Sequence, residues 1–442
     1  MSVQAFPQTA TTSSEARAVQ PALLVPEPSA LLEALRVLGP RVERAALLSA
    51  RRAVFTFCER LRHGSLTLTD AEGTAAFGCT AVDLPVVRIR VHDLRFYAYA
   101  MLWGARGGGE AFALGLWDSD DPVGVVRLFA RNVEALESFD QRLPRPWRMM
   151  IDRLRTQRAG VSKATTRRDV QAHYDLSNDF YALWLDETRS YSCALFERQD
   201  ATLEEASLAK IDRILGKLEL QPGDRLLEIG TGWGALALRA ASQYGCHVVT
   251  TTLSDAQRSF TMQKAMALGL SDRVHVLGAD YRELQGQYDK LVSVEMIEAV
   301  GPHGLGPYFR KATSLLKPGG RMALQAITLC ERRYEAARRQ EDYIKRYIFP
   351  GSCLPSLSAL ARASAEADLE ADGSEDLSAH YPRTLASWRE RFMNALPEIE
   401  ALGLPQVFLR SWEWYLAYCE GGFREGHLGT HQLVYRRPLG AS

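Results

Sequence analysis

The sequence is poor in cysteine, has no net charge and lacks any long apolar run. Its seven cysteines are scattered and never spaced as CxxC, so neither a disulfide framework nor a zinc site is predicted, and a reducing, cytoplasmic compartment fits best. The 53 basic and 53 acidic side chains cancel, which excludes the global basic field of a nucleic-acid-binding protein. No stretch of about 20 apolar residues occurs, so no transmembrane segment is predicted. Residues 1–21 also lack the basic start and apolar core of a secretory signal.

The 442 residues exceed what a single hydrophobic core usually supports, so two domains are expected. Residues 1–28 are rich in Ser, Thr, Ala and Pro and predict a disordered lead-in. Residues 29–136 predict a small α+β domain, and residues 137–172, rich in Arg and Lys, an interdomain linker before a catalytic domain over 173–442. Within the small domain the pattern predicts a helix at 31–48 and strands at 65–69, 86–91 and 123–128.

From about Leu203 onward, helical and strand-like patterns alternate. Thr202 and Glu205 predict a capping box at the start of an amphipathic helix. Alternation of this kind predicts a mostly parallel sheet covered by helices on both faces, as in Rossmann-like α/β folds. The expected strands lie at 225–229, 247–252, 273–277, 290–294 and 322–328.

The strongest local motif is LLEIGTGWG, from Leu226 to Gly234. It ends one of the predicted strands and opens a helix, and its glycines let the backbone turn tightly and approach a ligand where a Cβ would collide. The spacing is GxGxG, with Glu228 two residues before the first glycine. That arrangement is typical of methyltransferases that bind S-adenosylmethionine (SAM), which has no pyrophosphate to hold. A purely structural glycine turn is the alternative. The predicted cofactor contacts here are Glu228, Gly230, Gly232 and Gly234.

Polar side chains follow the next two predicted strands. Thr252, Leu253 and Gln257 come after the second strand, where hydroxyl and amide groups can bond the ribose of the cofactor. Asp280 and Tyr281 come after the third strand, where an acid can accept a hydrogen bond from an adenine amino group. Because ligands of α/β proteins bind at the carboxyl ends of the strands, three ligand-compatible ends in order predict one cofactor site.

Seven segments share their order and spacing with one family of enzymes. They are 173–181 (HYDLSNDFY), 191–194 (YSCA), 228–234, 252–257 (TLSDAQ), 295–301 (EMIEAVG), 346–351 (RYIFPG) and 380–385 (HYPRTL). On these segments, between Arg168 and about Pro438, the chain resembles the cyclopropane-fatty-acyl-phospholipid synthases, which include the mycolic acid cyclopropane synthases. The resemblance implies a class I methyltransferase domain with a seven-stranded, mostly parallel sheet, preceded by the small α+β domain. It also adds Tyr174, Tyr191 and Ser192 to the expected cofactor contacts.

The resemblance implies methyl transfer from SAM to a cis double bond in an acyl chain of a membrane phospholipid. The alkene attacks the methyl group, and the resulting carbocation loses a proton to close a cyclopropane ring, with a bound bicarbonate ion as the base. A carbocation in an apolar tunnel needs negative charge or aromatic π-faces nearby, and water must be excluded from it. The protein would therefore visit the inner face of the membrane as a peripheral protein.

By the same resemblance, Cys193, Glu298 and Tyr381 match residues that hold the bicarbonate. A buried thiol, a charge on a helix surface and a core aromatic residue are the respective structural alternatives. Tyr347 and Phe349 are expected to line the acyl tunnel or to stabilise the cation, with plain packing as the alternative.

Two positions depart from the family pattern. Gln325 stands where many members carry a histidine that binds the bicarbonate, and Ala299 stands where many carry a second histidine. An amide can donate a hydrogen bond to an anion but cannot carry a proton or a positive charge. The sequence therefore predicts weaker binding of bicarbonate or a different deprotonation step.

Several alternatives remain open at this point. The cation could lose its proton from a neighbouring carbon and give a methyl- or methylene-branched chain, or capture water. The chain could instead be a small-molecule methyltransferase, or a lipid-binding protein without activity. The small domain could present substrate or mediate a homo-oligomer. Two basic runs, within 148–168 and 332–346, could be solvated helices or contacts with anionic lipid.

Overall fold

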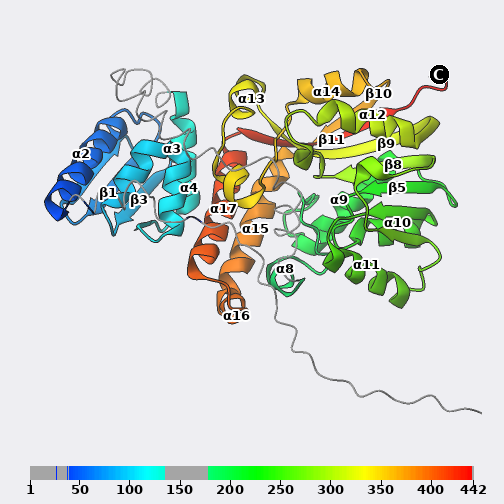
Figure 1. Cartoon of the computed structure of the whole chain (residues 1–442), viewed down its shortest axis with the longest axis horizontal. Coiled ribbons are helices and arrows are strands. Elements are labelled where there is room, and N and C mark those ends of the chain that lie inside the picture. The colour runs from blue at the N-terminus through cyan, green and yellow to red at the C-terminus, as the bar shows by residue number, and fades with distance from the viewer. Residues whose placement is uncertain (1–25, 27–36, 38, 135–177, 441–442) are drawn as a thin grey trace, which may run out of the picture.

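The computed structural model describes residues 26, 37, 39–134 and 178–440. They form two sheets, one at each end of an elongated molecule, with helices α15 (Tyr381–Asn394), α16 (Leu396–Ala401) and α17 (Gln406–Arg424) between them (Figure 1). The linker expected at 137–172 falls within 135–177, outside the described residues, so the domain boundaries stay predictions.

The small N-terminal sheet has four strands in the order β2-β1-β3-β4, with β1 and β3 parallel and the other pairs antiparallel. The turn at residues 70–73 joins β1 to β2 as a hairpin. Helices pack with this sheet and complete the α+β domain that the sequence predicts. The elements are α2 (Pro40–Cys58), β1 (Ser65–Asp70), β2 (Gly73–Gly78), β3 (Val86–Val91), α3 (Arg95–Ala113), β4 (Trp117–Asp118) and α4 (Pro122–Arg131).

The strand predicted at 123–128 is wrong, because this segment belongs to helix α4. Its β-branched residues favour a strand, but the preceding residues start a helix. The carboxylate of Asp121 accepts a hydrogen bond from the backbone N–H of Gly124 at 2.7 Å, and Pro122 has the fixed φ suited to a first helical position. Val125 and Leu128 then share a buried face. The helix predicted at 31–48 is described from Pro40 onward and extends to Cys58.

The large sheet has seven strands in the order β10-β11-β9-β8-β5-β6-β7. The pairs β9–β8, β8–β5, β5–β6 and β6–β7 are parallel, whereas β11 runs antiparallel to both of its neighbours. All five strands predicted from the sequence are confirmed. The strands are β5 (Arg225–Ile229), β6 (His247–Thr251), β7 (Val274–Leu277), β8 (Tyr288–Val294), β9 (Leu316–Leu329), β10 (Glu370–Asp376) and β11 (Leu428–Arg436).

Helices and short helical turns fill the connections of this sheet. Thr202 and Glu205 form the predicted capping box at the start of α9. The helices are α8 (Asn178–Trp184), α9 (Leu203–Lys217), α10 (Ala235–Tyr244), α11 (Asp255–Ala267), α12 (Leu305–Leu315), α13 (Glu331–Ala337) and α14 (Leu357–Ala365). Single turns are η1 (Tyr281–Glu283), η2 (Ile297–Val300), η3 (Ile344–Ile348) and η4 (Ser378–His380). Within the described ranges, every helix is too short or too polar to cross a bilayer.

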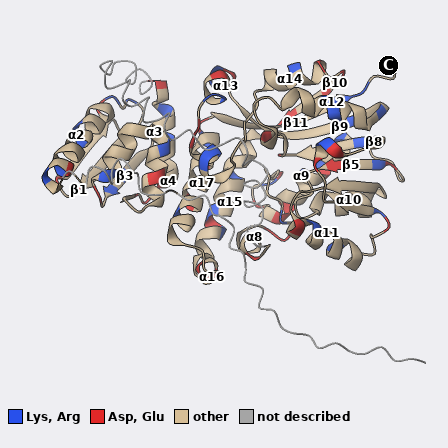
Figure 2. Ribbon diagram, viewed as in Figure 1, with Lys and Arg blue, Asp and Glu red and all other residues tan. Residues whose placement is uncertain are grey.

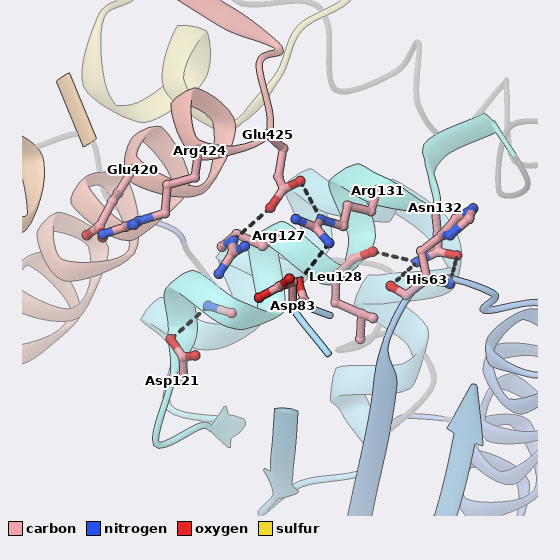
Figure 3. Close-up of polar contacts among 11 residues, drawn as sticks. His63, Asp83, Asp121, Arg127, Leu128, Arg131, Asn132, Glu420, Arg424 and Glu425 are labelled. Atoms are coloured by element: carbon pink, nitrogen blue, oxygen red, sulfur yellow. Dashed lines mark hydrogen bonds and ion pairs between the residues drawn. The ribbon is translucent and has the colours of Figure 1, made fainter. Parts of the chain in front are cut away.

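Helix α17 joins the N-terminal domain to the rest of the chain by contacts with α3 and α4. Glu425, at the end of α17, accepts hydrogen bonds from the Nε atoms of Arg127 (2.7 Å) and Arg131 (2.5 Å) of α4 (Figure 3). The indole of Trp414 packs at 5.3 Å from the ring of Phe112. A Cβ added to Gly109 would lie only 2.3 Å from Trp414, so α3 and α17 pack closely there. The two domains therefore share one interface.

Candidate active site

The glycine turn between β5 and α10 has the conformation that the motif predicts. Gly230, Gly232 and Gly234 all have positive φ, at 103°, 52° and 81°. A Cβ on Gly234 would lie 2.4 Å from the side chain of Thr261, so packing against α11 requires glycine there. In contrast, a Cβ on Gly232 would meet no described atom within 4 Å. Gly232 therefore leaves open space beside its backbone, which fits a cofactor that approaches the turn.

The polar residues expected around the cofactor follow strands β6 and β7, of which β6 lies next to β5 and β7 next to β6. The hydroxyl of Thr252 donates to Oε1 of Gln257 at 2.8 Å across the first turn of α11, and Leu253 lies between them in the chain. Asp280 caps the short helix η1 and accepts from Arg282 at 2.6 Å, and Tyr281 packs edge-on against Tyr308. The fold thus brings three predicted strand ends to one edge, and their contacts with a cofactor stay a prediction.

Two titratable groups, Glu228 and Lys210, are buried in this part of the fold. Glu228 accepts a hydrogen bond from the hydroxyl of Thr250 at 2.6 Å, and burial raises its pKa to about 8. Lys210 of α9 donates from Nζ to the hydroxyl of Ser192 at 2.8 Å, and burial lowers its pKa. Lys210 is not predicted as a site residue from the sequence, although it shares a helical face with the buried Ile214. It places a cation beside the acidic centre described next.

Glu295 is the centre of the residues that the resemblance assigns to an anion. Its Oε1 accepts the backbone N–H of Cys193 at 3.0 Å and Nε2 of Gln325 at 2.8 Å. Its Oε2 accepts the hydroxyl of Tyr381 at 2.7 Å. Burial raises the pKa of Glu295, while these three hydrogen bonds and the charge of Lys210 oppose the shift. The structure therefore brings Cys193, Gln325 and Tyr381 together around a residue to which the sequence analysis gave no role.

The predicted residue Glu298 lies one turn beyond Glu295, in η2. Its Oε1 accepts the backbone N–H of Ile327 at 2.6 Å. Among the described residues, its buried Oε2 has no hydrogen-bond partner. Burial, together with the charge of Glu295, raises the pKa of Glu298 to about 8, so this carboxyl is mostly protonated at neutral pH. In its protonated form the carboxyl group of Glu298 can donate a hydrogen bond.

The thiol of Cys193 is not the group that faces Glu295. Its sulfur lies 3.8 Å from the carbonyl oxygen of Leu377, and burial raises its pKa well above the usual value. A buried thiol with a raised pKa is inert as a nucleophile. The backbone N–H of Cys193 makes the contact with the carboxylate.

Aromatic rings pack against the ring of Tyr381. Tyr381 stacks on Phe423 at 4.2 Å and meets Trp388 edge-on at 6.2 Å. Trp388 in turn lies 5.2 Å from Tyr191, whose ring is 6.5 Å from Phe349. These rings place π-faces on one side of the acidic centre, which suits a site that must stabilise positive charge.

Tyr347, expected to line the acyl tunnel, has a hydroxyl group that contacts a residue of the N-terminal domain. Its hydroxyl donates to Oε1 of Glu110 in α3 at 2.9 Å, so it contacts the N-terminal domain. A role of its ring in lining the tunnel stays a prediction. Tyr174 lies outside the described residues, as does the basic run within 148–168.

The basic run at 332–346 is largely paired. Arg332 donates to Glu134 at 2.9 Å, and Arg339 donates to Glu335 at 3.3 Å. Their side chains are nevertheless 66% and 72% exposed, so their charges remain available at the surface. Figure 2 shows where basic and acidic residues lie along the ribbon of α13. A separate surface hollow of about 750 Å³ lies over α9. Neither Tyr347 nor Phe349 lines this hollow.

Among the described strands of the seven-stranded sheet, only β11 runs antiparallel to the others, and strand β5 ends in a glycine turn that is open to a ligand. These two features define a class I SAM-dependent methyltransferase. A family model described as mycolic acid cyclopropane synthetase matches residues 161–433. The chain belongs to this family, the SAM-dependent methyltransferases of the cyclopropane synthase type.

Three similar proteins place the chain within the family. The tuberculostearic acid methyltransferase UfaA1 of Mycobacterium tuberculosis is 38% identical over 408 residues, which cover 90% of this chain and 94% of that protein. The cyclopropane-fatty-acyl-phospholipid synthase of Escherichia coli is 34% identical over 353 residues, which cover 79% of this chain and 87% of that protein. The crystal structure of the mycolic acid cyclopropane synthase CmaA1, complexed with SAH and CTAB, is 34% identical with a TM-score of 0.58; the match covers 61% of this chain and 98% of that one.

Proposed function

We propose that this chain transfers a methyl group from SAM to a cis double bond in an unsaturated acyl chain of a membrane phospholipid, and that loss of a proton then closes a cyclopropane ring. The observation that carries the proposal is the buried acidic centre of Glu295 and Glu298, bounded by the rings of Tyr381 and Trp388. Such a centre suits a carbocation that must be stabilised and then deprotonated. The family membership supports the same chemistry.

Each part of the site has a role in this proposal. SAM, when bound, supplies an electrophilic methyl group, and Gly230, Gly232 and Gly234 with Thr252 and Gln257 would hold it. The cofactor set further includes Tyr191, Ser192, Glu228, Leu253, Asp280 and Tyr281. The aromatic rings exclude water, so that the cation is not captured as an alcohol. The Glu295 carboxylate holds negative charge near the cation.

Three of the residues expected to hold bicarbonate bind the side chain of Glu295 instead, so they do not fit the ion. The N–H of Cys193, the amide of Gln325 and the hydroxyl of Tyr381 all donate to Glu295. A second anion beside this carboxylate would be repelled, and these three donors are already occupied. We therefore route no step through bicarbonate.

A second product is favoured by one observation. The relative that covers 90% of this chain is named a tuberculostearic acid methyltransferase, and the histidine expected at the anion site is replaced by Gln325. If the cation loses its proton from a neighbouring chain carbon, the product carries a methyl branch beside a double bond in place of a ring. If a hydride first shifts so that the methyl-bearing carbon becomes the cation, proton loss from the methyl group gives a methylene branch. Nuclear magnetic resonance of the product separates the two, because only the ring gives strongly shielded cyclopropyl protons.

Mass spectrometry of lipids from cells that express the chain tests the proposal. We expect unsaturated acyl chains to be joined by species heavier by one CH₂, and these species to be missing with an empty vector. If the protein is folded and abundant but no heavier acyl species forms, the proposed function is wrong.

We also propose that exposed basic residues of α13 and its flanks bring the enzyme to anionic phospholipid, because each such charge is worth about 1 kcal/mol near the membrane surface. Reversal of Arg332 and Arg339 to Glu should weaken binding to phosphatidylglycerol vesicles by about tenfold or more and leave the affinity for SAM unchanged. Reversal of Arg44 and Arg52 on α2 is the control. Equal losses in both variants would contradict a specific membrane face.

A further inference from the structure

The acidic centre contains a carboxylate in a setting built for an anion. Glu295 accepts three hydrogen bonds, two at Oε1 and one at Oε2, from Cys193, Gln325 and Tyr381. The N–H of Cys193 and the Nε2 of Gln325 can only donate, so Oε1 faces two fixed donors. A carboxylate that receives charge-assisted bonds of this kind is held firmly in one orientation.

A series of hydrogen bonds that begins at Lys217 fixes the orientation of the Gln325 amide. Lys217 donates from Nζ to Oε1 of Gln432 at 2.5 Å, and Gln432 donates from Nε2 to Oε1 of Gln325 at 3.0 Å. Because the ammonium of Lys217 can only donate, each amide in the series is turned one way. The series ends with Nε2 of Gln325 directed at Glu295.

The backbone of Glu295 is held in a conformation that costs free energy. Its φ is 48°, in the left-handed region that non-glycine residues rarely adopt. Such residues persist where the surrounding structure imposes them, and they gather at functional sites. The three hydrogen bonds to the side chain supply that constraint. A glycine would take the same φ without strain, so it offers a clean variant that removes only the side chain.

We propose that Glu295 is the catalytic base of this enzyme, a carboxylate built into the chain at the place that the family resemblance assigns to a bicarbonate ion. This inference rests on the proposed function and deepens it. For ring closure, a C–H bond of the transferred methyl group breaks, and its electron pair forms the bond between the methyl carbon and the cationic carbon. For a branched product, a C–H bond on a chain carbon next to the cation breaks instead, and its electron pair forms a carbon–carbon double bond. The proton moves to a carboxylate oxygen of Glu295 and passes to solvent after the product leaves.

The environment suits this role. Burial raises the pKa of Glu295, which makes its carboxylate a stronger base than an exposed glutamate. Glu298, with a pKa of about 8, stays neutral beside it and does not compete as an anion. The charge of Lys210 favours the ionised form of Glu295 and opposes the rise of its pKa.

The test measures the activity of the full-length protein on vesicles of cis-monounsaturated phospholipid, in buffer stripped of carbon dioxide and with bicarbonate added back. The wild type should keep its rate in both buffers within about twofold. Glu295→Gln should lose about 100-fold or more in kcat, the scale of a general base. Its affinity for SAM, measured by calorimetry, should not change. Glu366→Gln, at an exposed position, is the control and should behave as the wild type.

The variant Glu295→Gly provides a second test in the same assay. We expect it to be nearly inactive in stripped buffer and to regain activity when bicarbonate or formate fills the vacated place. In parallel, the line width of ¹³C-bicarbonate in NMR should be unaffected by the wild type and broadened by Glu295→Gly.

The proposal is overturned if the wild type needs bicarbonate for activity, if it broadens the ¹³C-bicarbonate signal at this site, or if Glu295→Gln stays active. A wild type that makes no acyl product in either buffer refutes the proposed function instead. In that case the NMR arm still decides whether Glu295 holds the place of the ion.

Discussion

Gln325, within β9, and Glu295, directly after β8, join two adjacent parallel strands by two contacts. Nε2 of Gln325 donates to Oε1 of Glu295 at 2.8 Å, and the backbone N–H of Glu295 donates to the carbonyl of Gln325 at the same distance. The side chain that departs from the family pattern thus binds the acid that takes the place of the expected ion. We read the two residues as one functional unit.

This unit predicts that Gln432 acts as a positioning residue through Gln325. Gln432→Glu keeps an acceptor for Lys217 but presents a second acceptor to Gln325, which should turn the Gln325 amide and face its oxygen toward Glu295. We expect kcat to fall about tenfold and the acid limb of the pH–rate profile to move to higher pH, because Glu295 loses a stabilising donor. Gln432→Leu should show a smaller shift. An unchanged profile in Gln432→Glu would contradict the relay.

If Glu295 and Gln325 act together, replacing both residues should change the base from the Glu295 carboxylate to bicarbonate. The double variant Glu295→Gly with Gln325→His removes the built-in carboxylate and supplies the histidine that the family resemblance associates with bicarbonate. We expect its activity to rise with bicarbonate concentration, while the wild type stays indifferent. If both proteins respond alike, the two positions do not act as a pair.

Two glycines of the cofactor turn should separate binding from stability. Gly232→Ala meets open space, so it should cost only about 1 kcal/mol of unfolding free energy for the left-handed backbone and weaken SAM binding about tenfold or more. Gly234→Ala would collide with Thr261, so it should lower the unfolding free energy by about 2–4 kcal/mol. Calorimetry and urea unfolding measure the two effects. An unchanged SAM affinity in Gly232→Ala would place the cofactor elsewhere.

Buried Glu298 predicts a pH dependence of stability. Its pKa rises from 4.5 in the unfolded chain to about 8 in the folded protein, so the folded state binds more protons between these values. The free energy of unfolding should therefore fall as pH rises from about 5 to about 8, by up to about 1.4 kcal/mol per pH unit from this residue. Glu298→Gln should flatten that slope. Urea unfolding at pH 5.5 and 8 would contradict the assignment if both proteins show equal slopes.

The domain interface predicts a structural role for Glu425, which bridges Arg127 and Arg131 (Figure 3). Glu425→Ala leaves two partly buried arginines without this partner, so it should lower the unfolding free energy by about 2 kcal/mol. The affinity for SAM should not change, because the glycine turn lies in the other domain. Limited proteolysis should cut the N-terminal domain faster in this variant. Equal rates of cleavage would show that the two ion pairs contribute little.

The sequence predicted the large sheet well because its strands are short apolar runs with clear turns between them, as at 225–229 and 290–294. It failed at 123–128, where β-branched residues outweighed the start signal of Asp121 and Pro122. Local patterns could not assign β10 and β11 either, because antiparallel strands at the far edge of the sheet form only through long-range pairing.

The candidate site was predicted only in part, because some of its contacts also form only between residues that lie far apart in the chain. Motifs named Cys193, Glu298 and Tyr381, but the role of Glu295 depends on donors that lie far apart in the chain. One signal was present: an acid directly follows β8 in a sequence that lacks the expected histidine at Gln325. Lys210 was missed because a lysine among apolar helix positions is usually a surface residue, whereas here it is buried beside Ser192.

The most direct measurement supplies the full-length protein with SAM carrying a ¹³C-labelled methyl group and with vesicles of cis-monounsaturated phospholipid, then analyses the acyl chains by mass spectrometry. The account predicts chains heavier by one labelled CH₂, formed at the same rate after carbon dioxide has been removed. Unlabelled chains from a protein that binds SAM would contradict it.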